Sequence, residues 1–349
     1  MKNKIHFLNT IWSDSILIES QGHFALIDSG SDFYYPMIKA YLEELNIKRL
    51  DFLLLTHFHN DHYGCMIDLL NDFEFDCVYM RDYSGHSGTN ANGHDAGDEY
   101  REGETNNATA IKEKAKEKSN LVMIEDDFDH LDFYDFHFDV FGAYENIRRI
   151  YEDENSKYYH MNRFNENYDC ISLFCQLEGI NIYLGGDITD CDNSEFLELD
   201  HLNRRAVLAI YKKYNIDKIN LYKVAHHGVH DSNSKETMAL IRPDYAIITN
   251  TDRWLRNYPT ISYLVDGNKD VKILRTDWQK FVFEIENKKL KYHAITCDSL
   301  FDEWKIGLDL SFYFLFNNNM VKLMCIGGNY EENWNWKSWK EDDFKRIWK

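Results

Sequence analysis

The feature that most constrains this chain is a short apolar run that ends in a dense cluster of metal-type ligands. Residues 53–64 read LLLTHFHNDHYG, so three histidines and an aspartate follow the apolar residues within six positions. The run is too short for a buried helix and is closed by polar residues, which indicates a buried strand. The ligands then lie on a loop at the carboxyl end of that strand, where α/β folds usually place their chemistry.

The spacing within this loop predicts two metal positions. His57 and His59 are two residues apart and can direct their rings the same way, whereas Asp61 and His62 come one turn later and suit a second metal. Imidazole and carboxylate ligands together bind zinc, iron or manganese. A surface loop can hold one stray histidine, but four such residues after an apolar strand favour a metal site.

Two later strand ends carry the same kind of residue. The predicted strand 180–184 leads into Gly185, Gly186 and Asp187, and the predicted strand 221–225 leads into His226 and His227. The glycines let the backbone approach closely, and a carboxylate placed there can bridge two metals. We therefore expect two divalent metal ions, zinc first and manganese or iron as alternatives. His57 and His59 would hold the first ion, Asp61, His62 and His226 the second, and Asp187 both.

These residues resemble the metal-binding signature of the metallo-β-lactamase fold superfamily. The resemblance implies an αββα sandwich, in which two mixed β-sheets are flanked by helices, here with a small C-terminal appendage. A two-fold rhythm suits that fold, because antiparallel strands open each half and alternating strands and helices follow. The resemblance also implies that Asp28, in the Asp-Ser-Gly at 28–30, supports the metal loop by hydrogen bonding.

Many superfamily members place a further histidine between the first motif and the Gly-Asp, and no histidine here falls at a strand end in that interval. His130, His137 and His160 are candidates by count only. Asp169, just before the predicted strand 170–177, is expected to take this ligand position.

Three segments narrow the resemblance: YLGGD at 183–187, AHHGVHDSN at 225–233 and LRTD at 274–277. They resemble the hydrolase domain of ComEC-type DNA-uptake channels, while residues 15–30 resemble the catalytic module of phosphorylcholine esterases. Both resemblances imply hydrolysis of a phosphate ester. Tyr258-Pro259 stands where the uptake-channel relatives tend to have His-Pro, and the membrane channel and the choline-binding repeats are absent. DNA uptake and the release of wall-bound choline are therefore not expected.

The resulting hypothesis is a dinuclear metal-dependent phosphodiesterase that cleaves a small or short phosphate ester, of nucleotide or phosphocholine type, with a metal-bound hydroxide. Asp61 would also orient the hydroxide, and His227 or His230 would bind the phosphate or protonate the leaving oxygen. One alternative is a hydrolase of the same fold that acts on a thioester, a lactone or a β-lactam. Another is a non-catalytic, metal-bound module that recruits a partner.

Composition limits the partners. The formal net charge is −20 over 349 residues, which disfavours long nucleic acid and anionic membrane as binding partners. No apolar stretch approaches the roughly 20 residues that span a bilayer, and the N-terminus lacks a signal-peptide core. The seven cysteines are scattered without a Cys-x-x-Cys pair. Reduced thiols in a cytoplasmic protein are therefore expected.

The sequence divides into a hydrolase domain, residues 1–296, and a C-terminal appendage, residues 297–349. The appendage contains two apolar strand-like runs, and its end, residues 334–348, holds four of the eight tryptophans. Such a cluster more often packs against its own domain or a second subunit than binds a ligand, so a homo-oligomer is compatible with it. Two polar segments, residues 84–97 and 144–167, are expected to pass over the surface near the site.

Overall fold

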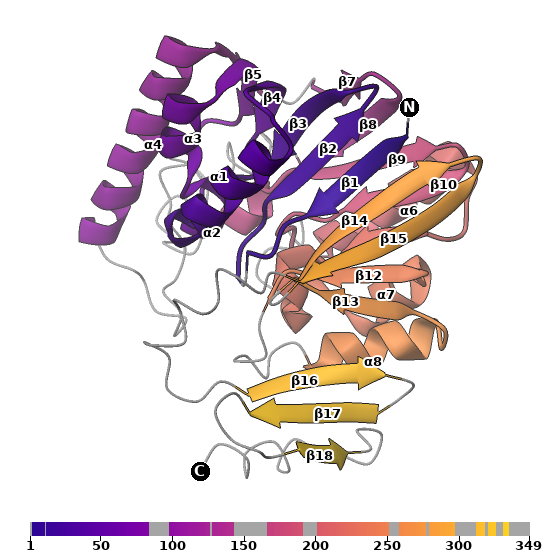
Figure 1. Ribbon diagram of the computed structural model, residues 1–349. Coiled ribbons are helices and arrows are strands. Elements are labelled where there is room, and N and C mark those ends of the chain that lie inside the picture. The colour runs from indigo at the N-terminus through magenta and orange to yellow at the C-terminus, as the bar shows by residue number, and fades with distance from the viewer. Residues whose placement is uncertain are drawn as a thin grey trace, which may run out of the picture.

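Two mixed β-sheets face each other and carry helices on their outer faces (Figure 1). This computed structural model describes residues 2–10, 12–83, 98–125, 128–142, 166–190, 201–250, 258–276, 279–296, 312–317, 320–325 and 331–334. The predicted αββα sandwich is confirmed. Within these ranges, none of the helices combines the length and the apolar character required to cross a bilayer.

The first sheet has eight strands, antiparallel on one side and parallel on the other. In spatial order they are β15 (Lys289–Thr296), β14 (Gln279–Glu286), β1 (Asn3–Phe7), β2 (Ile16–Ser20), β3 (His23–Ile27), β4 (Arg49–Leu54), β5 (Glu74–Met80) and β6 (Asn120–Met123). Because β4 runs parallel to both of its neighbours, its carboxyl end lies at the edge of the sheet where β3 and β5 also end.

The second sheet has seven strands and the same division into a parallel and an antiparallel part. In spatial order they are β13 (Lys272–Arg275), β12 (Tyr245–Ile248), β11 (Leu221–Lys223), β10 (Ile180–Leu184), β9 (Ser172–Leu177), β8 (Phe136–Phe141) and β7 (His130–Phe133). Strands β10 to β13 are parallel, so the segments that follow β10, β11 and β12 leave the same edge.

Alternation along the strands divides the core into three layers, because successive side chains point to opposite faces of a sheet. Phe52 and Leu54 of β4 pack between the sheets, where they share a cluster with Ile182 and Leu221 of the second sheet. Leu53, between them in sequence, packs against the helices on the outer face. The apolar run that precedes the ligand loop is therefore buried on both faces of the sheet.

Each outer face is covered by its own helices. The first sheet carries α1 (Tyr35–Glu44), α3 (Met66–Asp72) and α4 (Asp98–Lys118), and the second carries α6 (Leu202–Tyr214), α7 (Lys235–Ile241) and α8 (Tyr258–Gly267). The segment after the ligand loop forms two short helices, α2 (Asn60–Tyr63) and α3, with a break between them. At the break, a Cβ on Gly64 would lie 2.3 Å from the backbone N of Asp32, so only glycine allows this approach.

The chain after Thr296 contributes no strand to either sheet within the described residues. Strands β16 (Phe312–Asn317), β17 (Met320–Cys325) and β18 (Glu331–Trp334) form a separate antiparallel sheet. The domain boundary at 296/297 stays a prediction. Residues 84–97, almost all of 144–167 and most of the tryptophan-rich end lie outside the described residues, as does His160.

Candidate metal centre

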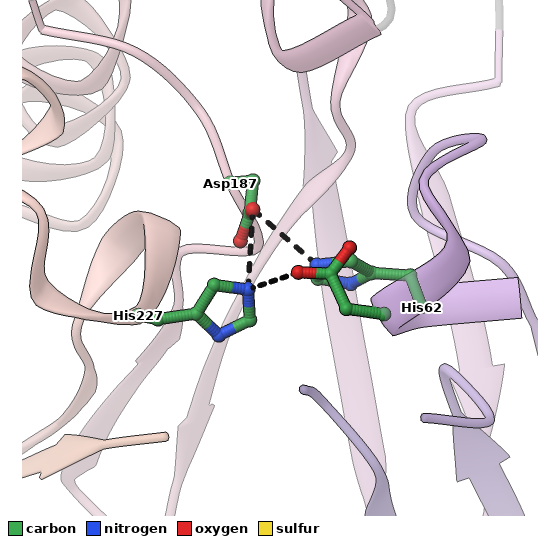
Figure 2. A group of neighbouring side chains, drawn as sticks. His62, Asp187 and His227 are labelled. Atoms are coloured by element: carbon green, nitrogen blue, oxygen red, sulfur yellow. Dashed lines mark hydrogen bonds and ion pairs between the residues drawn. The ribbon is translucent and has the colours of Figure 1, made fainter. Parts of the chain in front are cut away.

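Three strand ends bring the candidate ligands together between the two sheets. The loop after β4 carries His57, His59, Asp61 and His62, and the turn after β10 carries Asp187. The third end is η4 (Ala225–Gly228), a single turn after β11 that holds both adjacent histidines. Figure 2 shows His62 and His227 side by side, with the ring of each directed toward the Asp187 carboxylate. Residues far apart in sequence therefore meet at one point.

The first group of ligand atoms consists of His57, His59 and Asp187, whose candidate atoms all lie within 4.8 Å of one another. Nε2 of His57 lies 2.9 Å from Nδ1 of His59 and 3.9 Å from Oδ2 of Asp187. Two imidazole nitrogens and a carboxylate oxygen at this separation form one face of a coordination sphere for a divalent metal.

The second group consists of Asp61, His62, Asp187 and His227, again with candidate atoms within 4.8 Å of one another. Oδ2 of Asp187 lies 3.3 Å from Nε2 of His62 and 3.4 Å from Nε2 of His227. Nε2 of His227 is also 3.0 Å from Oδ2 of Asp61. Asp187 belongs to both groups, and the same carboxylate oxygen faces each of them.

The donor set fits divalent metals, and the fit rests on polar atoms that the fold leaves without a partner. Nε2 of His62 and Oδ1 of Asp187 are buried and have no hydrogen-bond partner among the described residues. Burying such groups without a partner is costly. A cation held by the second group would give Nε2 of His62 its missing partner, whereas Oδ1 of Asp187 lies 3.6 Å from the Lys223 ammonium in an ion pair.

The ring of His62 is fixed from behind by a buried carboxylate. Oδ2 of Asp28 lies 2.7 Å from Nδ1 of His62, and Asp28 also accepts hydrogen bonds from the backbone N and the hydroxyl of Thr56, both at 2.8 Å. A proton on Nδ1 leaves Nε2 free to bind a metal. Asp28 thus supports the metal loop, as expected.

The ring of His227 is fixed in the same way by Thr249 and Asp14, which no sequence pattern indicates. Its Nδ1 lies 2.9 Å from the Thr249 hydroxyl, which in turn donates to Oδ1 of Asp14 at 2.6 Å. Asp14 Oδ1 is itself 3.4 Å from Nδ1 of His227. Asp14 follows Ser13 just before β2, a position that reads as a simple turn, so only its place in the fold indicates this role.

Electrostatics keep the first pair of histidines neutral. Burial lowers the pKa of His57 well below its ordinary value, and the neighbouring His62 and His59 lower it further. Burial likewise lowers the pKa of His59 to about 4, although Asp61 and Asp187 act in the opposite direction. Both imidazoles are therefore unprotonated at neutral pH, the form that binds metal.

The second group is held together by opposite charges. Burial opposes protonation of His62 and His227, but Asp187, with Asp28 for His62 and Asp14 for His227, outweighs it and raises both pKa values. Burial would raise the pKa of Asp61, but His62 and His227 lower it to about 2. Protons on the two histidines thus supply the positive charge that metal ions would bring.

In the structure, each of the two adjacent histidines lies at the place predicted for the other. Sequence spacing assigned His226 to the second metal and His227 to the substrate, but His227 completes the second group and His226 lies outside it. The backbone explains this, because both residues have left-handed φ values of 48° and 50° and so direct their rings differently. His226 is 26% exposed, and its Nε2 lies 3.3 Å from the Asn167 amide and 3.8 Å from Oδ2 of Asp187.

Two further predicted residues lie outside both groups. The Asp169 carboxylate, in η2 (Glu166–Asp169), forms a buried ion pair with Arg81 and belongs to neither group, so its role as the missing ligand stays a prediction. His230 begins η5 (His230–Ser232) and is exposed, and its predicted catalytic role stays a prediction. His130 and His137, two of the other candidates for the missing ligand, are exposed. His130 pairs with Asp129, and His137 pairs with Asp132.

Gly186 is required by the turn that presents Asp187. Its φ is 51°, and a Cβ there would lie 2.6 Å from the carbonyl oxygen of Ile171 and 2.7 Å from Sγ of Cys170. That sulfur accepts a hydrogen bond from the backbone N–H of Asp187 at 3.0 Å. The Gly-Gly pair read from the sequence thus lets β9 and the turn approach closely.

Known proteins were compared with the chain by sequence and by structure. The sequence model described as the metallo-beta-lactamase superfamily matches residues 13–138. The search of curated proteins returned no significant match. YhfI from Bacillus subtilis, a metallo-beta-lactamase fold protein, is 11% identical with a TM-score of 0.45, over 81% of this chain and 100% of that one. A diphosphatase of the PhnP family is 12% identical with a TM-score of 0.43, over 82% of this chain and 98% of that one. A metallo-beta-lactamase from Cronobacter sakazakii is 15% identical with a TM-score of 0.35, over 62% of this chain and 76% of that one.

The segment matched by the family includes the loop after β4 and both carboxylates that support the second-group histidines. The remaining ligands come from the second sheet, which completes the sandwich. Most members of the matched family are metal-dependent hydrolases. Residues 13–138 thus match the metallo-β-lactamase superfamily, and the two-sheet sandwich is the fold that this resemblance implies.

Proposed function

We propose that the protein is a dinuclear metal-dependent phosphodiesterase that acts on a small or short phosphate ester. The observation that carries this proposal is the sharing of Asp187 by two groups of ligand atoms. His57 and His59 would hold one ion, Asp61, His62 and His227 the other, and Asp187 both. Two such ions supply an activated water and neutralise charge on a phosphoryl group.

The exposed side of the centre indicates where substrate would enter. The side chains of His57, His62, Asp187 and His227 are at most 1% exposed, whereas Asp61 is 29% and His226 is 26% exposed. A substrate phosphate would therefore approach past Asp61 and His226. His226 belongs to neither group and its Nε2 contacts the Asn167 amide at 3.3 Å on this side, so by exchanging that contact it would donate a hydrogen bond to a phosphate oxygen or a proton to the leaving oxygen.

Charge supports a small substrate. The chain carries a net charge of −20, which repels a long polyanion. Two divalent ions would reverse the sign only locally, so one phosphodiester group could bind where an extended nucleic acid would not. The narrower resemblance of segments 183–187 and 225–233 to phosphate-ester hydrolases favours the same chemistry.

An activity panel tests the proposal. The protein, loaded with Zn²⁺ or Mn²⁺, should cleave bis-p-nitrophenyl phosphate or p-nitrophenyl phosphorylcholine, and His59→Ala should abolish this. His130→Ala changes an exposed histidine and is the matched control. Turnover of thioesters, lactones or β-lactams without phosphodiester cleavage would replace the proposal by the same fold acting on another bond. A protein that retains no transition metal after gentle purification would favour a non-catalytic module.

A further inference from the structure

Lys223 is a fully buried lysine on the inner face of the second sheet. It is the last residue of β11, and its exposed fraction is 0%. Leu221, two residues earlier on the same face, packs in the core between the sheets. A lysine at the next inward position is costly to bury unless its charge is paired and its N–H groups are bonded.

Three acceptors surround the ammonium group. Nζ of Lys223 forms an ion pair with Asp14, donates to the carbonyl oxygen of Gly186 at 3.0 Å and lies 3.6 Å from Oδ1 of Asp187. The first two contacts lie within hydrogen-bond range, and the third is an ion pair at a longer distance. Two of these acceptors belong to the turn that presents Asp187.

The two oxygens of Asp187 have different surroundings. Oδ2 lies 3.3 Å from His62 Nε2, 3.4 Å from His227 Nε2 and 3.9 Å from His57 Nε2, so it faces both ligand groups. Oδ1 faces the Lys223 ammonium instead. A carboxylate can bridge two metals through one oxygen or through both, and a cation beside Oδ1 favours bridging through Oδ2 alone.

We propose that Lys223 is a positioning residue that binds Oδ1 of Asp187 and thereby makes Oδ2 the single oxygen shared by the two metal ions. This inference rests on the proposed two-metal function. Asp14 extends the arrangement, because it pairs with Lys223 and also contacts Nδ1 of His227 and the Thr249 hydroxyl. The bridging carboxylate and a histidine of the second group are thus oriented by one buried charge pair.

Lys223→Met tests the proposal, because it keeps the length of the apolar stem and removes the ammonium. Metal affinity is measured with Zn²⁺ and Mn²⁺ by chelator competition and elemental analysis. Loss of an outer partner of a ligand typically weakens metal binding about 10–100-fold. We expect a loss of this size for the second ion bound and a smaller one for the first.

Lys280→Met is the matched control. Lys280 is also a buried strand lysine, 5% exposed, but it pairs with Glu44 and lies over the Tyr41 ring rather than beside a ligand. The Lys280→Met variant should be less stable than the wild type but bind both metal ions with unchanged affinity. If Lys223→Met also loses stability alone, with both metal affinities unchanged, Lys223 only balances charge and the proposal is overturned.

A crystal structure of the metal-loaded wild type provides a second test that needs no folded variant. The proposal expects both ions on Oδ2 of Asp187 and a hydrogen bond from Lys223 to Oδ1, and one ion on each oxygen would overturn it. A wild type that binds two ions without cleaving phosphodiesters contradicts the proposed function and leaves this inference intact. A wild type that does not bind two ions overturns both.

Discussion

The carboxylate of Asp28 lies 2.7 Å from Nδ1 of His62, and both side chains are buried. The arrangement at His227 is closely similar, with Asp14 and Thr249 taking the places of Asp28 and Thr56. Each threonine follows a parallel strand, β4 or β12, one in each sheet. The two histidines of the second group are therefore oriented by similar pairs of a carboxylate and a threonine, with one threonine from each sheet and both carboxylates from the first. Both histidines direct Nε2 toward Asp187.

Asp28→Asn should weaken binding of the second metal ion about 10–100-fold, the usual cost of losing an outer partner of a histidine ligand. The amide keeps the size of the side chain but loses the charge that orients His62. Chelator competition measures the affinity. Asp51→Asn is the control, because Asp51 contacts His23 in an exposed pair. Equal affinities in the two variants would show that Asp28 does not support the centre.

The exchange between the adjacent histidines predicts different outcomes for two alanine variants. His227→Ala should bind one metal ion per chain, since it removes a member of the second group. His226→Ala should bind two and lose turnover, since its imidazole lies on the exposed side of the centre. Elemental analysis beside kinetics distinguishes them. One ion in His226→Ala and two in His227→Ala would restore the assignment made from the sequence.

Asp169→Asn should leave the number of bound metal ions unchanged and destabilise the fold. Asp169 pairs with Arg81, and both side chains are buried. Removing one partner of a buried pair typically costs about 3–5 kcal/mol of unfolding free energy, because the other charge stays buried. Urea denaturation measures the loss. A variant of unchanged stability that lacks a metal ion would instead make Asp169 the missing ligand.

Metal binding should release protons, and the release should come from the second group. The pKa values of His62 and His227 are raised, so both are protonated at neutral pH without metal and must lose a proton to coordinate it. Affinity for the second ion should therefore increase as pH rises toward those pKa values. The lowered pKa values of His57 and His59 predict no release from the first group near pH 7.

Calorimetry at pH 7 in buffers of different ionisation enthalpy counts the released protons. The expected result is a release that accompanies the second ion and not the first. Binding without proton release at either step would contradict the charge arrangement described for the second group.

The sequence by itself determined the types of ligand and their places at strand ends. The run before His57, the Gly-Gly before Asp187 and the strand before His226 are each local patterns, and the carboxyl ends of parallel strands meet at one edge of a sheet. That relation is enough to expect residues distant in sequence to converge, and the resemblance of these motifs to the superfamily implies the sandwich. The support of the metal loop by Asp28 is implied by the resemblance to the superfamily, since the Asp-Ser-Gly motif alone indicates only a turn.

Only the tertiary structure decided which side chains face the centre and which residues stand behind them. Two consecutive left-handed residues set the directions of His226 and His227, and single-sequence patterns do not encode such φ values. Asp14, Lys223 and Thr249 are unrelated in sequence and meet only because the two sheets pack face to face. A buried lysine in an apolar strand can be read from the sequence, but its partner across the sandwich cannot, since that contact depends on how the two sheets are packed.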